Sequence, residues 1–265
     1  MNIDRDFDDP RGSYLDLQDR SRPAGPETPS LWPVWLEGIS ERQLCQPGTE
    51  LIQQGTSLRQ VYVLETGIVK LTHVDQSGTE MILSLRFPGW FLGVSAVIAQ
   101  RPSPVSVTTV SRCTLRRIPV AAFRELLDSD LALSSHIHQL QAKEVVDQQT
   151  YLAQLGTLSS RERLERVLRE LISALHSQPS KAGIRLQLPI NGRELARLVA
   201  ITPEHLSRLL RQMENDGVIR RDRGWLIVCD VDRLSSTPGA ERVARCTCTF
   251  CSNIAHFGAG RSHAG

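Results

Sequence analysis

Residues 188–228 read LPINGRELARLVAITPEHLSRLLRQMENDGVIRRDRGWLIV, and this stretch decides the fold of the C-terminal part of the chain. Apolar residues at helical spacing predict a first helix at about Arg193 to Val199. Thr202 is suited to be the N-cap of a second helix, and Pro203 to be its first residue, where a missing N–H costs nothing. A short β-hairpin is predicted for residues 219–228. The order of helix, turn, helix and hairpin indicates a winged helix-turn-helix.

The second helix of this stretch has two different faces. One face is apolar and is expected to pack inward, and it contains Leu206, Leu209, Leu210 and Met213. The other face is polar, and the N-terminal turns of such a helix enter the major groove of DNA first. Arg208 can donate two parallel hydrogen bonds to guanine O6 and N7, while Glu204 can accept one from a cytosine amino group or orient Arg208. The simpler alternative is a solvated helix face with an ordinary ion pair between Glu204 and Arg208. The predicted DNA-binding residues are Thr202, Pro203, Glu204, Ser207, Arg208 and Arg211.

The first half of the chain has a different pattern. Between about residues 31 and 122, short β-rich runs such as VYVL and EMILSLRF are separated by glycines. Regular short strands of this kind favour an antiparallel β-barrel or jelly roll. The segment QSGTE, at residues 76–80, is a plausible hairpin turn. The fold class expected for the whole chain is therefore α+β.

Residues 123–157 predict a long helix. Its apolar residues recur at steps of mostly three or four, and they include Leu133, Ile137, Leu140, Val145, Leu152 and Leu155. A helix that keeps such a stripe between two domains is expected to pair with its twin in a parallel dimer. The alternative is that the stripe packs only on its own barrel. A further helix is predicted after Ser159, which has capping-box spacing with Glu162.

This order of elements, together with TPEHLSRLLRQMENDGVI, resembles the CRP/FNR family of bacterial transcription regulators. The resemblance covers roughly residues 40–234, and Glu204, Ser207 and Arg208 are spaced as in the FNR branch. It implies a cyclic-nucleotide-binding-type jelly-roll barrel, a dimerisation helix and a winged helix-turn-helix. It also implies a homodimer that binds double-stranded DNA at half-sites like TTGAT or TTGAC, one helical turn apart, and that recruits or blocks RNA polymerase. Pro203 stands where many relatives have Arg, which puts the outer base preference in doubt.

The family's cyclic-nucleotide pocket uses a Gly-Glu pair and an Arg-Ser or Arg-Thr pair. The matching positions here are Gly93-Val94 and Val105-Ser106. An anionic cyclic phosphate would therefore enter without its partners, at a cost of several kcal/mol, and this argues against cyclic AMP. Arg101 and Arg112 are near enough in sequence to compensate. The alternative function is a regulator that uses the barrel pocket for another small molecule.

The six cysteines are unevenly distributed. Cys45 and Cys113 are interpreted as small buried hydrophobes. Near the C-terminus, CxCxxC offers three soft ligands for zinc or an iron–sulfur cluster, with Cys229, His256 or an oxygen as a fourth. A thiol–disulfide switch and an incidental tail are the alternatives. The predicted ligands are Cys246, Cys248, Cys251 and Cys229, and binding there would make DNA affinity redox-linked or metal-linked.

The composition sets further bounds. The chain has 265 residues, with 31 basic and 29 acidic side chains, so any DNA binding must come from a local surface. No apolar run is long enough for a membrane span, and the acidic N-terminus is unlike a signal peptide, so a cytoplasmic protein is expected.

Mobile tails are predicted at 1–30 and 237–265, around a barrel domain at 31–122, the helix at 123–157 and a DNA-binding domain at 158–236. No nucleophile elbow, phosphate-binding loop or metalloprotease motif is present, and His136 and His138 face different sides of a helix, so catalysis is not expected.

Overall fold

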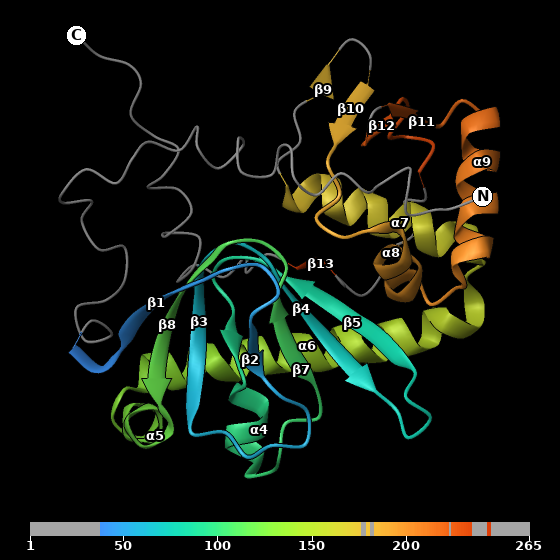
Figure 1. Cartoon of the computed structure of the whole chain (residues 1–265). Coiled ribbons are helices and arrows are strands. Elements are labelled where there is room, and N and C mark those ends of the chain that lie inside the picture. Colours follow the sequence, from blue (N-terminus) through green and yellow to red (C-terminus); the bar gives the residue numbers. More distant parts are fainter. Residues whose placement is uncertain (1–37, 176–178, 181–182, 223, 235–242, 245–265) are drawn as a thin grey trace, which may run out of the picture. The chain divides into compact units, whose positions relative to one another are not determined.

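A computed structural model of the chain describes residues 38–175, 179–180, 183–222, 224–234 and 243–244 (Figure 1). The predicted N-terminal tail, and all of the predicted C-terminal tail except 243–244, lie outside these residues. The described residues fall into two compact units. The barrel unit contains residues 38–68 and 87–141. The helix-turn-helix unit contains residues 69–86 and 142–244.

The barrel unit contains only part of the predicted set of short strands, since VYVL lies in it while the run EMILSLRF, predicted for the same barrel, lies in the helix-turn-helix unit. A four-stranded antiparallel sheet has the order β1-β8-β3-β6, formed by β1 (Glu41–Cys45), β8 (Cys113–Pro119), β3 (Gln60–Thr66) and β6 (Phe91–Leu92). A second antiparallel pair joins β2 (Glu50–Ile52) to β7 (Ser106–Thr109). The unit also contains α4 (Val94–Ala99), α5 (Val120–Ser129) and the start of a long helix, α6 (Leu131–Thr157).

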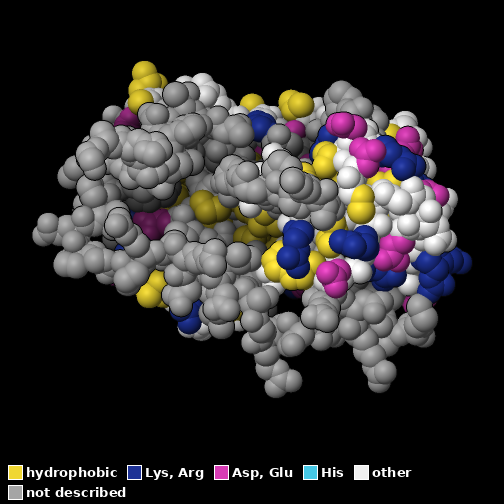
Figure 2. Space-filling model, turned by 90° about the horizontal axis from the view of Figure 1, so that it is seen from above, with side chains coloured by type: hydrophobic (Ala, Val, Ile, Leu, Met, Phe, Trp, Pro, Cys, Tyr) yellow, Lys and Arg dark blue, Asp and Glu magenta, His cyan; other side chains and the backbone are white. Residues whose placement is uncertain are grey.

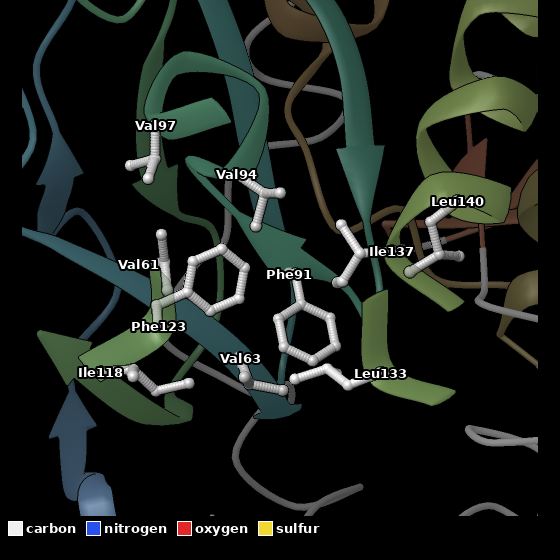
Figure 3. Close-up of a cluster of buried hydrophobic side chains, with 10 residues drawn as sticks. All are labelled: Val61, Val63, Phe91, Val94, Val97, Ile118, Phe123, Leu133, Ile137 and Leu140. Atoms are coloured by element: carbon white, nitrogen blue, oxygen red, sulfur yellow. The ribbon is translucent and has the colours of Figure 1, made fainter. Parts of the chain in front are cut away.

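The core of the barrel unit is a cluster of ten buried apolar side chains (Figure 3). At its centre the rings of Phe91 and Phe123 lie with their centroids 6.4 Å apart. Leu133 and Ile137 reach this cluster from the start of α6. Deep burial of these side chains fixes the first half of α6 to the barrel, because each removes apolar surface from water.

The apolar stripe predicted on this helix is in fact two sets of residues on different faces. Leu133, Ile137 and Leu140 are buried in the barrel core, with at most 6% exposure. Val145 and Leu152 are 51% and 67% exposed. Leu155, the sixth residue of the predicted stripe, is partly buried. The grouping of all six into one pairing face was therefore wrong. A series of residues spaced three or four apart can drift around a helix, so its first and last members need not share a face. The sequence alone does not show which members of the series the barrel covers.

A separate, exposed stripe runs along α6 with steps of four and three residues throughout. It contains Leu131, Ser135, His138, Ala142, Val145, Gln149, Leu152 and Gly156, all of them exposed. This is the a/d spacing of a coiled-coil seam. Its apolar members become denser toward the second half of the helix, where Val146 adds a further exposed side chain.

The helix-turn-helix unit begins with a β-hairpin of β4 (Val69–Val74) and β5 (Glu80–Arg86). The turn predicted at QSGTE is confirmed, and the Asp75 carboxylate accepts hydrogen bonds from the backbone N–H groups of Ser77 and Thr79. The unit continues with α7 (Ser160–Ala174), α8 (Gly192–Val199) and α9 (Pro203–Asn215). A four-stranded sheet with the order β11-β12-β10-β9 is formed by β11 (Ile219–Asp222), β12 (Trp225–Val228), β10 (Gly183–Leu186) and β9 (Pro179–Ser180). The short strand β13 (Val243–Ala244) pairs in parallel with β5.

None of the described helices combines the length and the apolarity that a membrane span needs.

Candidate nucleic-acid interface

The two helices of the predicted reading motif are capped by their own side chains. Asn191 is the N-cap of α8, and it forms a capping box with Glu194, each side chain bonding the other residue's backbone N–H. Thr202 is the N-cap of α9, where its hydroxyl oxygen accepts from the His205 N–H at 3.2 Å, and Pro203 is the first helical residue. The predicted cap of α9 is confirmed. Each such cap typically contributes about 1 kcal/mol to helix stability.

The turn between the helices is sharp because Ala200 takes the left-handed conformation, with φ 59°. Its N–H and that of Ile201 bond back to the last carbonyls of α8, to Arg197 and Ala196 respectively. From α7, the Arg163 guanidinium donates to the Val199 carbonyl at 3.1 Å and lies 3.5 Å from that of Ala200. The orphan carbonyls at this helix end are thus satisfied from a neighbouring helix. No local pattern in the sequence indicates this contact of Arg163, since its partner lies 36 residues away.

The two faces of α9 are confirmed. Its apolar face is buried, with Leu206 and Met213 fully covered and Leu209 and Leu210 at 9% and 1% exposure. On the opposite side, Glu204, Arg208 and Arg211 are exposed, while Ser207 and Pro203 are partly covered. Thr202 is exposed beside them. The structure therefore brings the six predicted contact residues to the front of one capped helix.

Glu204 and Arg208 do not form the ion pair that the simpler interpretation required. Within the described residues no salt bridge engages Arg208, and its effect on Glu204 is a minor electrostatic one. The pKa of Glu204 is lowered mainly by its own backbone N–H and then by a hydrogen bond with Thr202. The carboxylate is thus held by the helix start, and the guanidinium of Arg208 is exposed.

The first helix of the motif also contacts the β4–β5 hairpin. Lys70 forms an ion pair with Glu194, and Arg197 forms one with Glu80. Glu194 therefore has two roles, since it also completes the capping box of α8. These pairs join residues more than 100 positions apart, and no local pattern in the sequence indicates them.

The hairpin behind α9 is β11 and β12, as predicted for residues 219–228, with Gly224 at φ 82° in the turn. Arg185, from the unpredicted strand β10, lies over the Trp225 ring at 4.6 Å. Arg221 forms a bidentate pair with Glu214 at the end of α9, with distances of 2.6 and 2.9 Å. This pair ties the hairpin to the reading helix.

We expect Glu214→Gln to destabilise the helix-turn-helix unit by about 1 kcal/mol at pH 7, since the pair is about three-quarters buried and charge-assisted. The hydrogen bond from Arg221 is the main cause that lowers the pKa of Glu214 below its usual 4.5. The stabilisation is therefore fully present above pH 4.5 and is lost as the pH falls through the lowered, folded-state pKa. Urea unfolding of both proteins between pH 7 and pH 3 measures this, with Glu125→Gln, at an exposed glutamate, as control. A difference from wild type that stays constant down to pH 3 would contradict the assignment.

The barrel positions that match the family's nucleotide pocket are occupied by other contacts. Gly93 is the N-cap of α4 at φ 86°, and Val94 is buried in the core cluster. The Ser106 hydroxyl oxygen accepts the Gln54 N–H at 3.0 Å. Arg101 and Arg112, the two arginines considered as substitutes, are exposed. The expectation that this pocket does not bind a cyclic phosphate stays a prediction.

The predicted metal site lies almost entirely outside the described residues. Cys246, Cys248, Cys251 and His256 are not described, and Cys229 is exposed just after β12. Within the described part of the chain, no three His, Cys, Asp or Glu side chains gather as a ligand set. Metal or cluster binding by the C-terminal cysteines stays a prediction.

Charge on the described surface is mixed. On the face displayed in Figure 2, basic and acidic side chains are interspersed over the described atoms. A broad positive field of the kind that binds nucleic acid without sequence preference is not visible on that face. The exposed front of α9 is mixed as well, since it carries Arg208 and Arg211 beside Glu204.

Comparisons with known proteins agree with this arrangement. A family model described as a cyclic nucleotide-binding domain matches residues 42–130, and one described as a Crp-like helix-turn-helix domain matches residues 162–237. The anaerobic regulatory protein of Haemophilus influenzae is 25% identical over 78% of this chain and 80% of its own length. The transcriptional activator protein FnrL of Cereibacter sphaeroides is 25% identical over 77% and 83%.

Solved structures show the same fold. FixK2 from Bradyrhizobium japonicum superposes with a TM-score of 0.65 at 17% identity, covering 76% of this chain and all of that one. The c-di-GMP responsive regulator CLP of Xanthomonas campestris gives 0.65 at 21% identity, covering 74% and 96%. The two family models lie along the chain in the same order as the barrel and the winged motif, and one of the two sequence relatives is named a transcriptional activator. The chain is therefore a member of the CRP/FNR family, a DNA-binding transcription regulator and not an enzyme.

Proposed function

We propose that the chain binds a pseudo-palindromic operator as a homodimer, with α9 of each subunit in the major groove. The observation that carries this proposal is the exposed front of α9, where Arg208 has no salt bridge within the described residues while the back of the helix is buried. In this position Arg208 donates two hydrogen bonds to guanine O6 and N7. Glu204 accepts from a cytosine amino group on the neighbouring pair. Half-sites of the form TTGA(T/C) supply such a guanine.

The dimer contact in this proposal is the exposed stripe on α6. Its four-and-three spacing matches a two-stranded coiled coil, and Val145 and Leu152 are apolar side chains that a monomer would leave in water. Two reading helices held by one seam would present themselves with two-fold symmetry. Half-sites should then be separated by one helical turn, roughly 10 base pairs centre to centre.

Regulation follows from the placement of this dimer on a promoter. The bound protein either recruits RNA polymerase through a surface contact or blocks its access to the promoter. A cytoplasmic location is compatible with recruitment and with blocking. Transcription reactions with purified polymerase and a promoter carrying the selected operator distinguish the two.

Selection from random duplex DNA tests the proposed operator. The purified full-length chain is incubated with the library at about 0.15 M salt, and bound duplexes are sequenced over several rounds. We expect an inverted repeat with a guanine at the same place in each half. Recovery of a single asymmetric site, or of no enriched sequence, would overturn the proposal. A parallel selection with Arg208→Ala shows whether that guanine depends on α9.

A further inference from the structure

Two cysteines that are 68 positions apart in the sequence lie opposite each other in the barrel unit. Cys45 ends β1 and Cys113 begins β8, and the two are direct partners in the antiparallel register. Both side chains are buried, at 4% and 0% exposure. Directly opposed residues of an antiparallel pair place their side chains on the same face, with Cα atoms about 4.5 to 5.5 Å apart. This separation lies inside the range that a disulfide bond requires.

We propose that Cys45 and Cys113 form an oxidative modification site, at which a peroxide converts the two thiols to an intrachain disulfide. From the sequence, Cys45 and Cys113 were interpreted as two separate buried hydrophobes. The register of β1 with β8 shows that they are neighbours. The residues of this site are different from those of the DNA-reading surface and from the C-terminal cysteines. A negative result for the disulfide would therefore not contradict the proposed operator, and the reverse also holds.

The Cys113 sulfur is held in its present position only by weak polar contacts. The Cys113 thiol lies 3.4 Å from the Ile68 carbonyl and 3.3 Å from that of Ser111. These are weak contacts, and rotation about the Cα–Cβ bond releases both. Gly67 passes close by, because a Cβ there would lie 2.6 Å from the Cys113 sulfur. A larger residue at position 67 would therefore collide with the thiol.

The two thiols differ in how easily they are reached. Burial raises the pKa of Cys113 to about 11. Burial also raises the pKa of Cys45, although a hydrogen bond with Gln43 opposes that rise. Among the described strands, β1 is at the edge of its sheet and pairs with β8 only. Local opening of this edge exposes Cys45 first, so Cys45 is the attacking thiol and Cys113 the resolving one.

The chemistry has two steps. The Cys45 thiolate attacks one oxygen of hydrogen peroxide, the O–O bond breaks, and the leaving hydroxide takes up a proton to become water. Cys45 is then a sulfenic acid. The Cys113 sulfur attacks the Cys45 sulfur, the S–O bond breaks and a second water leaves. In sum, two thiols and one peroxide give one disulfide and two waters, and exchange with a free thiol reverses the oxidation.

A variant that keeps only this pair tests the proposal. Cys229, Cys246, Cys248 and Cys251 are replaced by Ser, and the protein is treated with hydrogen peroxide and digested without reduction. Mass spectrometry should find the peptides of Cys45 and Cys113 joined within one chain. Thermal unfolding should shift upward by roughly 5 to 15 °C and return with dithiothreitol, since the bond closes a long loop. Recovery of both cysteines as thiols, or of links only between chains, would overturn the proposal.

Single replacements test the order of the two steps. With Cys113→Ser, a sulfenic acid should persist at Cys45 and be trapped by dimedone. With Cys45→Ser, Cys113 should gain no adduct. Should either replacement prevent folding, timed alkylation of the untreated wild-type chain shows whether the Cys45 thiol is reached before that of Cys113, with the exposed Cys229 as the reactive reference. Equal trapping at both positions would overturn the assigned order.

Discussion

Replacing Val145 and Leu152 of α6 with glutamate should convert the protein to monomers and weaken operator binding by at least about 100-fold. Both side chains are more than half exposed in the single chain and lie on the four-and-three stripe. Four carboxylates would meet in the paired helices, where their desolvation is costly. A monomer holds one half-site only, and it loses the gain in effective concentration that comes from linking two reading helices, on the order of 10²-fold to 10⁴-fold.

Sedimentation velocity and a gel-shift titration measure these two effects on the same preparation. The control is Gln139→Glu with Gln148→Glu, which adds the same charge at exposed positions of α6 outside the stripe. The control should remain dimeric and keep its affinity. If the Val145 and Leu152 variant sediments like the wild type, the α6 stripe is not the dimer seam.

The second large effect is expected from Arg208→Ala. Loss of a bidentate contact to guanine typically costs about 1 to 3 kcal/mol, which corresponds to roughly 5-fold to 150-fold for each half-site. A dimer with two independent half-sites would lose roughly the product of the two factors. The preference for guanine over the other three bases at the contacted position should also disappear, because the first two turns of α9 contain no other arginine.

Arg208→Lys separates recognition of a base from attraction to phosphate. A lysine keeps the charge but cannot form the planar bidentate pair, so affinity should recover only in part and the guanine preference should remain weak. Arg101→Ala removes an equal charge from the barrel unit and is the matched control. Titrations against operators with each of the four bases at the contacted position measure both quantities. Retention of the full guanine preference in Arg208→Ala would remove this residue from the base-reading role.

Local signals in the sequence were sufficient for the reading motif. The cap at Thr202, the proline after it and the apolar face of α9 are within a few residues of one another, and all are found in the structure. The same holds for the capping box of Ser159 with Glu162 and for the turn stabilised by Asp75. Each depends on backbone hydrogen bonds that a short segment forms with itself.

Features that depend on distant partners could not be predicted in this way. Helical periodicity placed Leu133 and Val145 in one stripe, although the first packs on the barrel and the second is exposed. The Arg163 contact with the end of α8 and the register of Cys45 with Cys113 join segments far apart in the chain. Strand β10 was also missed, because four residues carry too little periodicity to identify it.

The division of α6 into an anchored half and an exposed half constrains how this helix can change in length. One inserted residue after Leu140 would turn everything beyond it by about 100° relative to the barrel, so Val145 and Leu152 would leave the seam that Leu131 begins. Seven inserted residues would nearly restore the alignment, as a heptad returns to within about 20°. Insertions and deletions in homologous helices should accordingly be tolerated as whole heptads and selected against as single residues.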